Sequence, residues 1–412
     1  MVEMLVEENE RNLEDKYVMH TFGRSPVEFV RGEGMHLYDI DGNEYLDFLA
    51  GIAVCCLGHS NKALTSAIKE QASELMHVSN YFYIKGRGEA AEKINTLLNF
   101  GSEKSADWKM FFANSGAEAN ECALKIARLR ANKKNKNDGS HTKVIVLKNS
   151  FHGRTLETLA ATAQNRFHEG FSPMSPVFLE VDANDKAQLE CLFNDQGENI
   201  CAMIIEPIQG ESGVHPLNES YMLLIRELTE KNDALMICDC VQTGVYRTGT
   251  PFAFQQSGVV PDVVTIAKAI GGGFPCGVCA ARGEAAQVFS PGDHGSTFGG
   301  SNLAIAAINA TLDELQRIDV LANVVNAGEY LKLKLEAIDG ILEVRGRGLM
   351  LGAELDKKFD AHEVVNEALL NQRLVINATS NSTLRFLPPL IVSRADIDEF
   401  AEKLQASIEA LS

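Results

Sequence analysis

The sequence predicts an α/β protein built on a large, mostly parallel sheet. Short apolar or β-branched runs alternate with amphipathic helical stretches through the middle of the chain. These runs are almost continuously hydrophobic, which is typical of strands that helices cover on both faces. In such sheets ligands bind beyond the carboxyl ends of the strands, so residues that directly follow the strands are the first candidates for a site.

The central part of the chain carries six predicted strands. They are KMFFAN (109–114), KVIVLK (143–148), CAMIIEP (201–207), ALMICD (234–239), DVVTIA (262–267) and CGVCAA (276–281). A helix is expected from residue 116 to about 132, because Ser115 and Glu118 have capping-box spacing before it. Segment 131–143, ANKKNKNDGSHTK, is low in complexity and is expected to form a solvated loop.

The two ends of the chain predict a second, smaller unit. Residues 28–48 have the pattern of strands joined in hairpins around the turn Asp41-Gly42. Beyond GGSNLA we expect helices over about 302–317, 321–338 and 394–410, the last capped by Ser393, and the short strands ILEV, LMLGAEL and LRFLP. We therefore expect an N-terminal segment (1–60) that contributes to a small domain, a large domain (61–305) and a C-terminal small α+β domain (306–412).

Composition limits the classes of partner. The 412 residues are 45% hydrophobic, and 56 acidic against 38 basic residues give a net charge of -18. This charge argues against nucleic acid and anionic membranes, both of which attract clustered Lys and Arg, so small metabolites are the expected partners. The acidic start has no apolar signal region, and no stretch approaches the roughly 18 apolar residues of a membrane span, so we expect a soluble, cytoplasmic protein.

Cysteine usage predicts reduced thiols and no metal site. Nine cysteines are scattered along the chain, unlike a secreted disulfide framework. The pairs Cys238 with Cys240 and Cys276 with Cys279 have spacing that a metal site can use, but both lie in apolar strand-like runs. Free cysteine is a common small core residue, and we favour packing over metal binding.

Three predicted strand ends carry polar groups. The helix after the first strand begins at Gly116, and its free amides suit a phosphate, although an ordinary capped helix explains the same residues. Asp239 ends a buried strand and needs a partner there, because an unpaired buried charge is costly. Lys268, in VTIAKAIGGG, follows another strand; a desolvated lysine becomes nucleophilic toward an aldehyde, whereas a salt-bridged lysine is the simpler alternative.

Taken together, the three groups are the contacts that pyridoxal 5'-phosphate (PLP) requires. The helix start suits the phosphate, an acid pairs with the protonated ring nitrogen, and the lysine bonds to the aldehyde carbon. On this hypothesis the glycines after Lys268 make room for cofactor and substrate.

The chain also resembles the class III (subgroup II) PLP-dependent aminotransferases, and among them the acetylornithine aminotransferases most closely. The matching segments are YLDFLAGIAV, FFANSGAEANECALKIAR, FHGRTLETL, IIEPIQGESGV, DCVQTGVYRTG, PDVVTIAKAIGGGFP, HGSTFGGSNLA, RGRGLMLGAEL and LRFLPPLIV. The resemblance implies the fold type I architecture, with a seven-stranded-type sheet between helices, and a homodimer whose active sites lie at the subunit interface.

The resemblance implies a role for each cofactor residue. Gly116 and Ala117, with Ser115 nearby, would bind the phosphate, and Phe151 and Val241 would pack on the two faces of the ring. Asp239 would pair with the ring nitrogen and Gln242 would hydrogen-bond near the ring oxygen. Lys268 would bond to the cofactor and afterwards move a proton, and Thr297 would reach the phosphate in the neighbouring subunit.

The resemblance also implies the substrate contacts. Arg385 would clamp the α-carboxylate, with Glu211 as its partner when no carboxylate is present, and Arg154 would hold the second carboxylate. Ser296 would lie beside the substrate of the neighbouring subunit.

The expected reaction moves the terminal amino group of N2-acetylornithine to 2-oxoglutarate and yields N-acetylglutamate semialdehyde and glutamate, a step of arginine biosynthesis. Ornithine aminotransferases carry a tyrosine where this chain has Ile52, and 4-aminobutyrate enzymes usually have tyrosine where Phe151 stands. Succinylornithine, succinyl-diaminopimelate and 4-aminobutyrate stay open as donors. Other classes also stay open: a PLP-binding module without catalysis, a decarboxylase or aminomutase on the same scaffold, and an α/β protein that does not use PLP.

Four features depart from the pattern of this family. Cys240 replaces an acid, Tyr246 and Ala269 replace glycines, and GGSN stands where GGNP is common. None removes a predicted contact to the cofactor. Tyr246 and Ala269 are expected to affect the width of the site or the loop geometry.

Overall fold

The computed structural model describes residues 10–102, 105–135 and 139–412 and contains one large and two smaller principal sheets. The large sheet has seven strands, in the spatial order β4 (Trp108–Ala113), β12 (Gly277–Arg282), β11 (Val263–Ile266), β10 (Leu235–Asp239), β7 (Ile200–Ile205), β5 (Lys143–Leu147) and β6 (Phe178–Val181). From β11 to β6 all neighbours are parallel, and β12 is antiparallel to both β11 and β4. The predicted α/β class with a mostly parallel seven-stranded sheet is confirmed.

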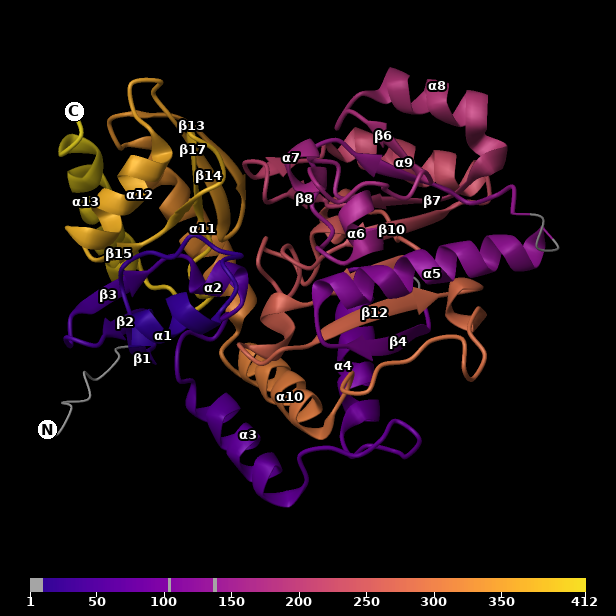
Figure 1. Cartoon of the computed structure of the whole chain (residues 1–412), viewed down its shortest axis with the longest axis horizontal. Coiled ribbons are helices and arrows are strands. Elements are labelled where there is room, and N and C mark those ends of the chain that lie inside the picture. The colour runs from indigo at the N-terminus through magenta and orange to yellow at the C-terminus, as the bar shows by residue number, and fades with distance from the viewer. Residues whose placement is uncertain (1–9, 103–104, 136–138) are drawn as a thin grey trace, which may run out of the picture.

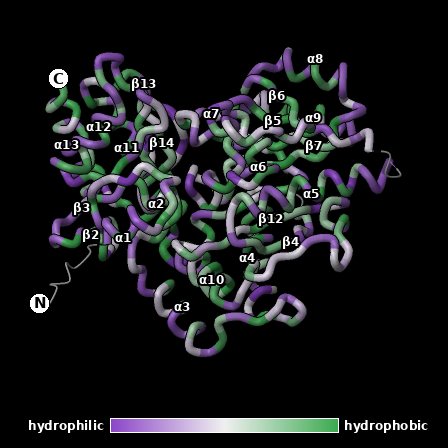
Figure 2. Tube along the Cα trace, viewed as in Figure 1, coloured by the Kyte–Doolittle hydropathy of each residue, from purple (hydrophilic) through white to green (hydrophobic). Residues whose placement is uncertain are grey.

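Helices cover both faces of this sheet, so its strands are buried on both sides. Val144 and Val146 of β5 belong to one hydrophobic cluster with helix α5 (Gly116–Lys134), whereas Ile145 and Leu147 belong to another that includes α9 (Glu219–Lys231). Figure 2 shows the resulting run of hydrophobic residues along the central strands. This two-sided burial is the reason that the strands have no alternating polar positions.

The remaining helices of this part connect the strands or pack at the edges of the sheet. They are α3 (Lys62–Glu74), α4 (Arg87–Leu98), α6 (Leu156–Ala161), α7 (Asn165–His168), α8 (Lys186–Gln196) and α10 (Asn302–Arg317). A short hairpin, β8 (Ile208–Gln209) with β9 (His215–Pro216), follows β7. Because β11, β10, β7 and β5 are neighbours and parallel, their carboxyl ends lie next to one another at one edge of the sheet.

Two four-stranded sheets form the other side of the molecule (Figure 1). One has the order β13 (Ile341–Arg347), β14 (Met350–Leu355), β17 (Thr383–Phe386) and β16 (Asn377–Ala378), all antiparallel. The other has the order β1 (Phe29–Glu33), β2 (His36–Asp39), β3 (Glu44–Asp47) and β15 (Leu374–Val375). Because β15 pairs with β3, the N-terminal hairpins are joined to the C-terminal part of the chain.

Helices α1 (Glu10–Tyr17), α11 (Val320–Glu336), α12 (Ala361–Leu370) and α13 (Arg394–Glu409) complete this side. Ser393 caps α13, as predicted, and forms a full capping box with Asp396. The domain boundaries at residues 60 and 305 stay a prediction.

Two local predictions need correction. Strand β6 (Phe178–Val181) lies at the edge of the large sheet and is absent from the predicted set. The expected loop over 131–143 begins later than predicted, since α5 extends to Lys134; residues 136–138 lie outside the described part of the chain.

A left-handed turn precedes α3 in the chain. Residues Ala50–Ala53, labelled α2, all have positive φ angles between 50° and 66°. A β-branched residue such as Ile52 enters this conformation only at a cost, on the order of 1 kcal/mol or more, which the surrounding contacts must offset. The turn lies beside the carboxyl edge of the large sheet, where Val54 lines the cavity described below.

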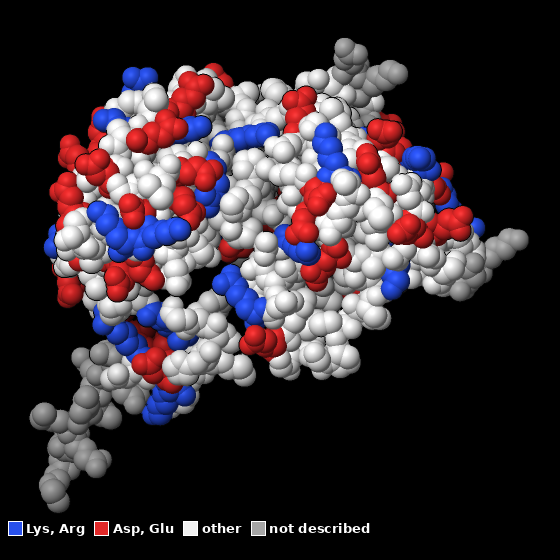
Figure 3. All heavy atoms as spheres, turned by 90° about the horizontal axis from the view of Figure 1, so that it is seen from above, with Lys and Arg blue, Asp and Glu red and all other residues white. Residues whose placement is uncertain are grey.

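Charge is spread over the surface that Figure 3 shows, where acidic and basic side chains are interspersed. Among the described residues, none of the helices combines the length and apolar character needed to cross a membrane. A cytoplasmic location stays a prediction.

Candidate functional site

A cavity of about 430 Å³ opens at the carboxyl ends of the central strands. All predicted site residues except Ser296, Thr297 and Arg385 line it. They come from the start of α5, the loop after β5, the loop after β7 and the ends of β10 and β11. The structure therefore brings residues that follow separate strands together around one cavity.

The start of α5 forms one end of this cavity. Ser115 is the N-cap, and its hydroxyl accepts a hydrogen bond from the Glu118 amide at 3.2 Å. The capping box is only half formed, because the Glu118 carboxylate accepts from the Asn114 amide at 2.8 Å instead of from Ser115. Gly116 and Ala117 lie in the first turn, where a helix provides no acceptor for its own amides, so these N–H groups suit a phosphate.

Gly116 is required for the close packing of the helix start against Val241. A Cβ atom at this position would lie 2.8 Å from Cγ1 of Val241. Val241, which follows the strand that carries Asp239, is thereby brought directly against the helix start.

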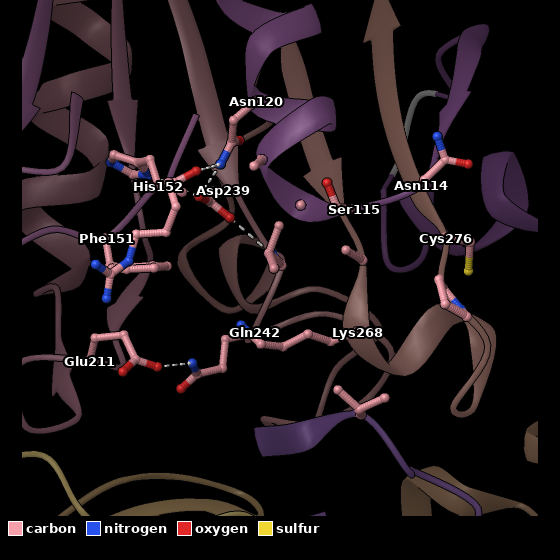
Figure 4. A pocket seen from close by; sticks show the side chains of 18 of the residues that line it. Asn114, Ser115, Asn120, Phe151, His152, Glu211, Asp239, Gln242, Lys268 and Cys276 are labelled. Atoms are coloured by element: carbon pink, nitrogen blue, oxygen red, sulfur yellow. Dashed lines mark hydrogen bonds and ion pairs between the residues drawn. The ribbon is translucent and has the colours of Figure 1, made fainter. Parts of the chain in front are cut away.

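Asp239 ends β10 as a buried carboxylate with three hydrogen-bond donors. Its Oδ2 atom accepts from Nδ2 of Asn120 at 2.8 Å and lies 2.8 Å from Nδ1 of His152, and Oδ1 accepts from the Val241 amide at 3.0 Å (Figure 4). Burial disfavours the imidazolium form of His152, but the hydrogen bond to Asp239 and the charge of that carboxylate outweigh burial and raise the pKa of His152. Both oxygens of Asp239 therefore have hydrogen-bond partners within the protein.

The hydrogen-bond partners of Asp239 are themselves held by further contacts. Asn120 accepts from the Thr265 hydroxyl at 2.7 Å and donates to the His152 carbonyl at 2.7 Å, so its amide orientation is determined by both neighbours. Burial raises the pKa of nearby Glu206 to about 7, and this carboxyl group accepts from the Phe151 amide at 2.9 Å. Sequence reasoning did not assign Asn120, His152, Thr265 or Glu206, although the cost of an unpaired buried carboxylate was a signal to look for such partners.

Lys268 lies in another part of the cavity wall, just after β11. Burial lowers the pKa of its amine below the ordinary value, against the attraction of Glu211 and Asp239. Its backbone is left-handed, with φ of 48°. A buried lysine with a lowered pKa holds more of the neutral, nucleophilic form at a given pH.

The three glycines after Lys268 were predicted to make room for cofactor and substrate, but they do not all have this role. Gly273 lines the cavity. A Cβ atom at Gly271 would lie 2.5 Å from Sγ of Cys276, and one at Gly272 would lie 2.7 Å from Oγ1 of Thr311. Only Gly273 therefore makes room beside the site, and the other two glycines are required by packing.

Arg385 lies behind the cavity wall, where Glu211 covers it. The guanidinium donates to Oε1 of Glu211 at 2.6 Å and to Oε1 of Gln242 at 3.2 Å, and only 1% of the arginine surface is exposed. Burial opposes ionisation of Glu211, but Arg385 outweighs it and lowers the pKa of this carboxyl group. Glu211 must move before a substrate carboxylate can take its place on Arg385.

Ser296 and Thr297 are not brought to this cavity. Ser296 lines a separate hollow, and its hydroxyl accepts from Nδ2 of Asn114 at 3.1 Å. Neither residue lines the cavity that contains Lys268.

The positions that depart from the expected pattern do not line the cavity. Tyr246 has φ of 66°, a conformation that glycine adopts more easily, and Ala269 is buried. Cys240 is fully buried, and burial raises the pKa of its thiol to about 12, so it is a packed side chain.

The residues fit PLP. A helix start, whose first amides have no acceptor within the helix, suits the phosphate; a buried carboxylate suits a protonated ring nitrogen, and a buried amine suits an aldehyde. Phe151 and Val241 also line the cavity, as required of residues that would contact the two faces of a flat ring.

Comparisons with known proteins agree with this geometry. The family model of class-III aminotransferases matches residues 18–408. The acetylornithine aminotransferase of Caldanaerobacter subterraneus is 46% identical over 94% of this chain and 95% of its own length. Among solved structures, the N-acetylornithine aminotransferase from Stenotrophomonas maltophilia K279a has a TM-score of 0.81 at 35% identity, covering 97% of this chain and 98% of its own. The ornithine aminotransferase from Toxoplasma gondii has a TM-score of 0.90 at 30% identity, covering 99% and 96%.

Replacing the carboxylate at the end of β10 tests its part in cofactor binding. We expect Asp239→Asn to weaken PLP binding by about 10- to 100-fold, because a hydrogen bond to a charged group contributes about 1.5–3 kcal/mol. Absorbance titration of the cofactor-free protein measures this affinity. Asp262→Asn is the matched control: Asp262 contacts Arg226 at 2.9 Å, outside the cavity lining, and its loss should lower stability while PLP affinity stays unchanged. Equal PLP affinity in Asp239→Asn and the parent chain would contradict the assignment.

Proposed function

The chain belongs to the class-III aminotransferases, and from this membership we propose that it transfers the terminal amino group of N2-acetylornithine to 2-oxoglutarate. The products are N-acetylglutamate 5-semialdehyde and glutamate, a step of arginine biosynthesis. It is a PLP-dependent transaminase. The observation that carries the choice of donor is the nearly full-length similarity to acetylornithine aminotransferases.

The surroundings of Ile52 support an acylated donor over free ornithine. Ile52 packs against an apolar group made of Ala53, Ile208, Val214, Met350 and Leu387. A free, charged α-amine placed here would exchange its water for apolar contacts without a hydrogen-bond partner, which is costly. An acetamido group loses much less in the same place.

PLP, when bound, provides an aldehyde for the amino group and an electron sink for the carbon that carries it. Side chains of the protein supply the other groups that the reaction needs. Asp239, oriented by its hydrogen bonds to His152 and Asn120, would pair with the ring nitrogen. The Nζ atom of Lys268, with its lowered pKa, accepts the proton from the amine-bearing carbon and returns a proton in the reverse direction.

One site must accept two different amino donors, and two arginines divide this task. Arg154 lines the cavity and takes a carboxylate directly. Arg385 takes the α-carboxylate of glutamate only after Glu211 moves away, since their side chains are paired at 2.6 Å. For acetylornithine, which reacts at its far amine, the α-carboxylate goes to Arg154 and Glu211 stays on Arg385.

We further propose a homodimer in which each subunit completes the site of the other. Leu75, Met76, Tyr81, Phe82 and Tyr83 are exposed, and Phe298 is 62% exposed beside Ser296 and Thr297. Monomers rarely expose so many neighbouring apolar side chains, so a second copy of the chain is the expected cover. The position of Ser296 and Thr297 outside the chain's own cavity supports their use in the partner's site.

The two half-reactions test the donor. Purified holoenzyme should lose its visible cofactor absorbance when N-acetylornithine is added and regain it with 2-oxoglutarate. Free ornithine, at the same concentration, is expected to react at least about tenfold more slowly, because its charged amine lacks a partner. A faster reaction with succinylornithine or 4-aminobutyrate would replace the proposed donor, and an unchanged spectrum with every donor would contradict a transaminase.

Hybrid dimers test the shared site. One chain carries Lys268→Ala, which removes the amine. The other chain carries Thr297→Asp, whose carboxylate should repel the cofactor phosphate in the site of its partner. A hybrid of the two variants, purified through two different tags, is expected to recover about half of the parent activity, because one of its sites keeps both residues. Activity no higher than that of the two parent variants would show that Lys268 and Thr297 do not serve one site across the interface.

A further inference from the structure

The guanidinium of Arg154 is supported by aromatic rings and not by an acid. Its Cζ atom lies 3.9 Å from the ring centroid of Phe167 and 5.4 Å from that of Phe151. Among the residues that the structure describes, the Arg154 guanidinium has no ion pair with a carboxylate. A cation over an aromatic face is attracted by the ring quadrupole, so these contacts hold the arginine in place.

Phe167 is itself anchored from several sides. It lies in α7, the short helix 165–168, and its ring makes a T-shaped contact with Phe151, with centroids 5.9 Å apart and planes at 79°. The ends of this helix are tied down, since Gln164 donates to the Ser150 carbonyl at 3.0 Å and His168 lies 2.9 Å from the Leu159 carbonyl. The ring therefore offers a fixed surface to the arginine.

The kind of support decides what the arginine can bind. A carboxylate partner occupies the N–H donors and neutralises the charge, as Glu211 does for Arg385. An aromatic face restrains the side chain and leaves the donors and the charge available. Arg385, behind the cavity wall, is thus covered by an acid, whereas Arg154, in the cavity lining, is ready for an anion.

We propose that Phe167 is a positioning residue of this transaminase, whose ring holds Arg154 in place for the substrate carboxylate. The proposal rests on the proposed function, because it deepens the part played there by Arg154. Arg166 also contacts this ring, with its Cζ atom 4.6 Å from the centroid, but it does not line the cavity. Arg154 is therefore the cation through which Phe167 acts on the substrate.

Binding of glutarate, a five-carbon dicarboxylate without an amino or oxo group, tests this proposal without turnover. Calorimetry on the holoenzyme should show about tenfold weaker binding in Phe167→Leu, in keeping with the loss of one cation–π contact. Phe171→Leu is the matched control, since Phe171 is an exposed phenylalanine three residues beyond α7, and it should bind within about twofold of the parent. PLP affinity should stay unchanged in both variants.

Fluorinated phenylalanines at position 167 separate the cation–π contact from simple packing. One, two and three ring fluorines weaken the quadrupole in steps while the shape changes little, so glutarate affinity should fall in the same order. Loss of affinity in Phe167→Leu without a trend in the fluorinated series would overturn the proposal in favour of a packing role.

A double variant tests whether Phe167 acts through Arg154. In the Arg154→Gln background, Phe167→Leu should cause no further loss of glutarate affinity. Independent, additive losses would overturn the proposal. A wrong choice of donor is recognised separately, because the parent enzyme would then not react with N-acetylornithine. The effect of Phe167 on glutarate affinity can still be measured in that case.

Discussion

The site depends on one buried charge, the carboxylate of Asp239 at the end of β10. Only 4% of this residue is exposed, and a carboxylate in such a place must be compensated. Asn120 from α5, His152 from the loop after β5 and the Val241 amide provide that compensation. The same contacts place the start of α5 and the neighbouring loop around the cavity, so satisfying one charge brings the phosphate end and the ring end of the cofactor site together.

The other charged residues of the site are arranged in a way that fits the proposed use of two donors. Arg385 is buried and paired with Glu211, which keeps its charge satisfied until a second carboxylate arrives. Arg154 instead rests on the rings of Phe167 and Phe151. In the proposed reaction a dicarboxylic donor would engage both arginines and an acylated donor only one, and the apolar group around Ile52 would receive the acyl group.

The sequence predicted the strands that carry the site, because two-sided burial makes β5, β7, β10 and β11 continuous apolar runs. Strand β6 was not predicted because it is an edge strand, with three of its four residues outside the core. The left-handed turn at Ala50–Ala53 had no local signal, since alanine and isoleucine do not favour positive φ and only tertiary contacts impose it. Asp239 and Lys268 were found from their positions after strands, but Asn120, His152 and Phe167 act through contacts between separate segments that local patterns do not encode.

The most direct test of this account is nitrogen-15 NMR of the holoenzyme loaded with PLP labelled at the ring nitrogen. If the Asp239 carboxylate pairs with the ring nitrogen, that nitrogen should stay protonated well above the pH at which free PLP loses its ring proton. A chemical shift typical of the protonated ring across neutral and mildly alkaline pH is the predicted result. A shift that follows the titration of free PLP would show that Asp239 does not hold the ring charge, and the central interaction would be wrong.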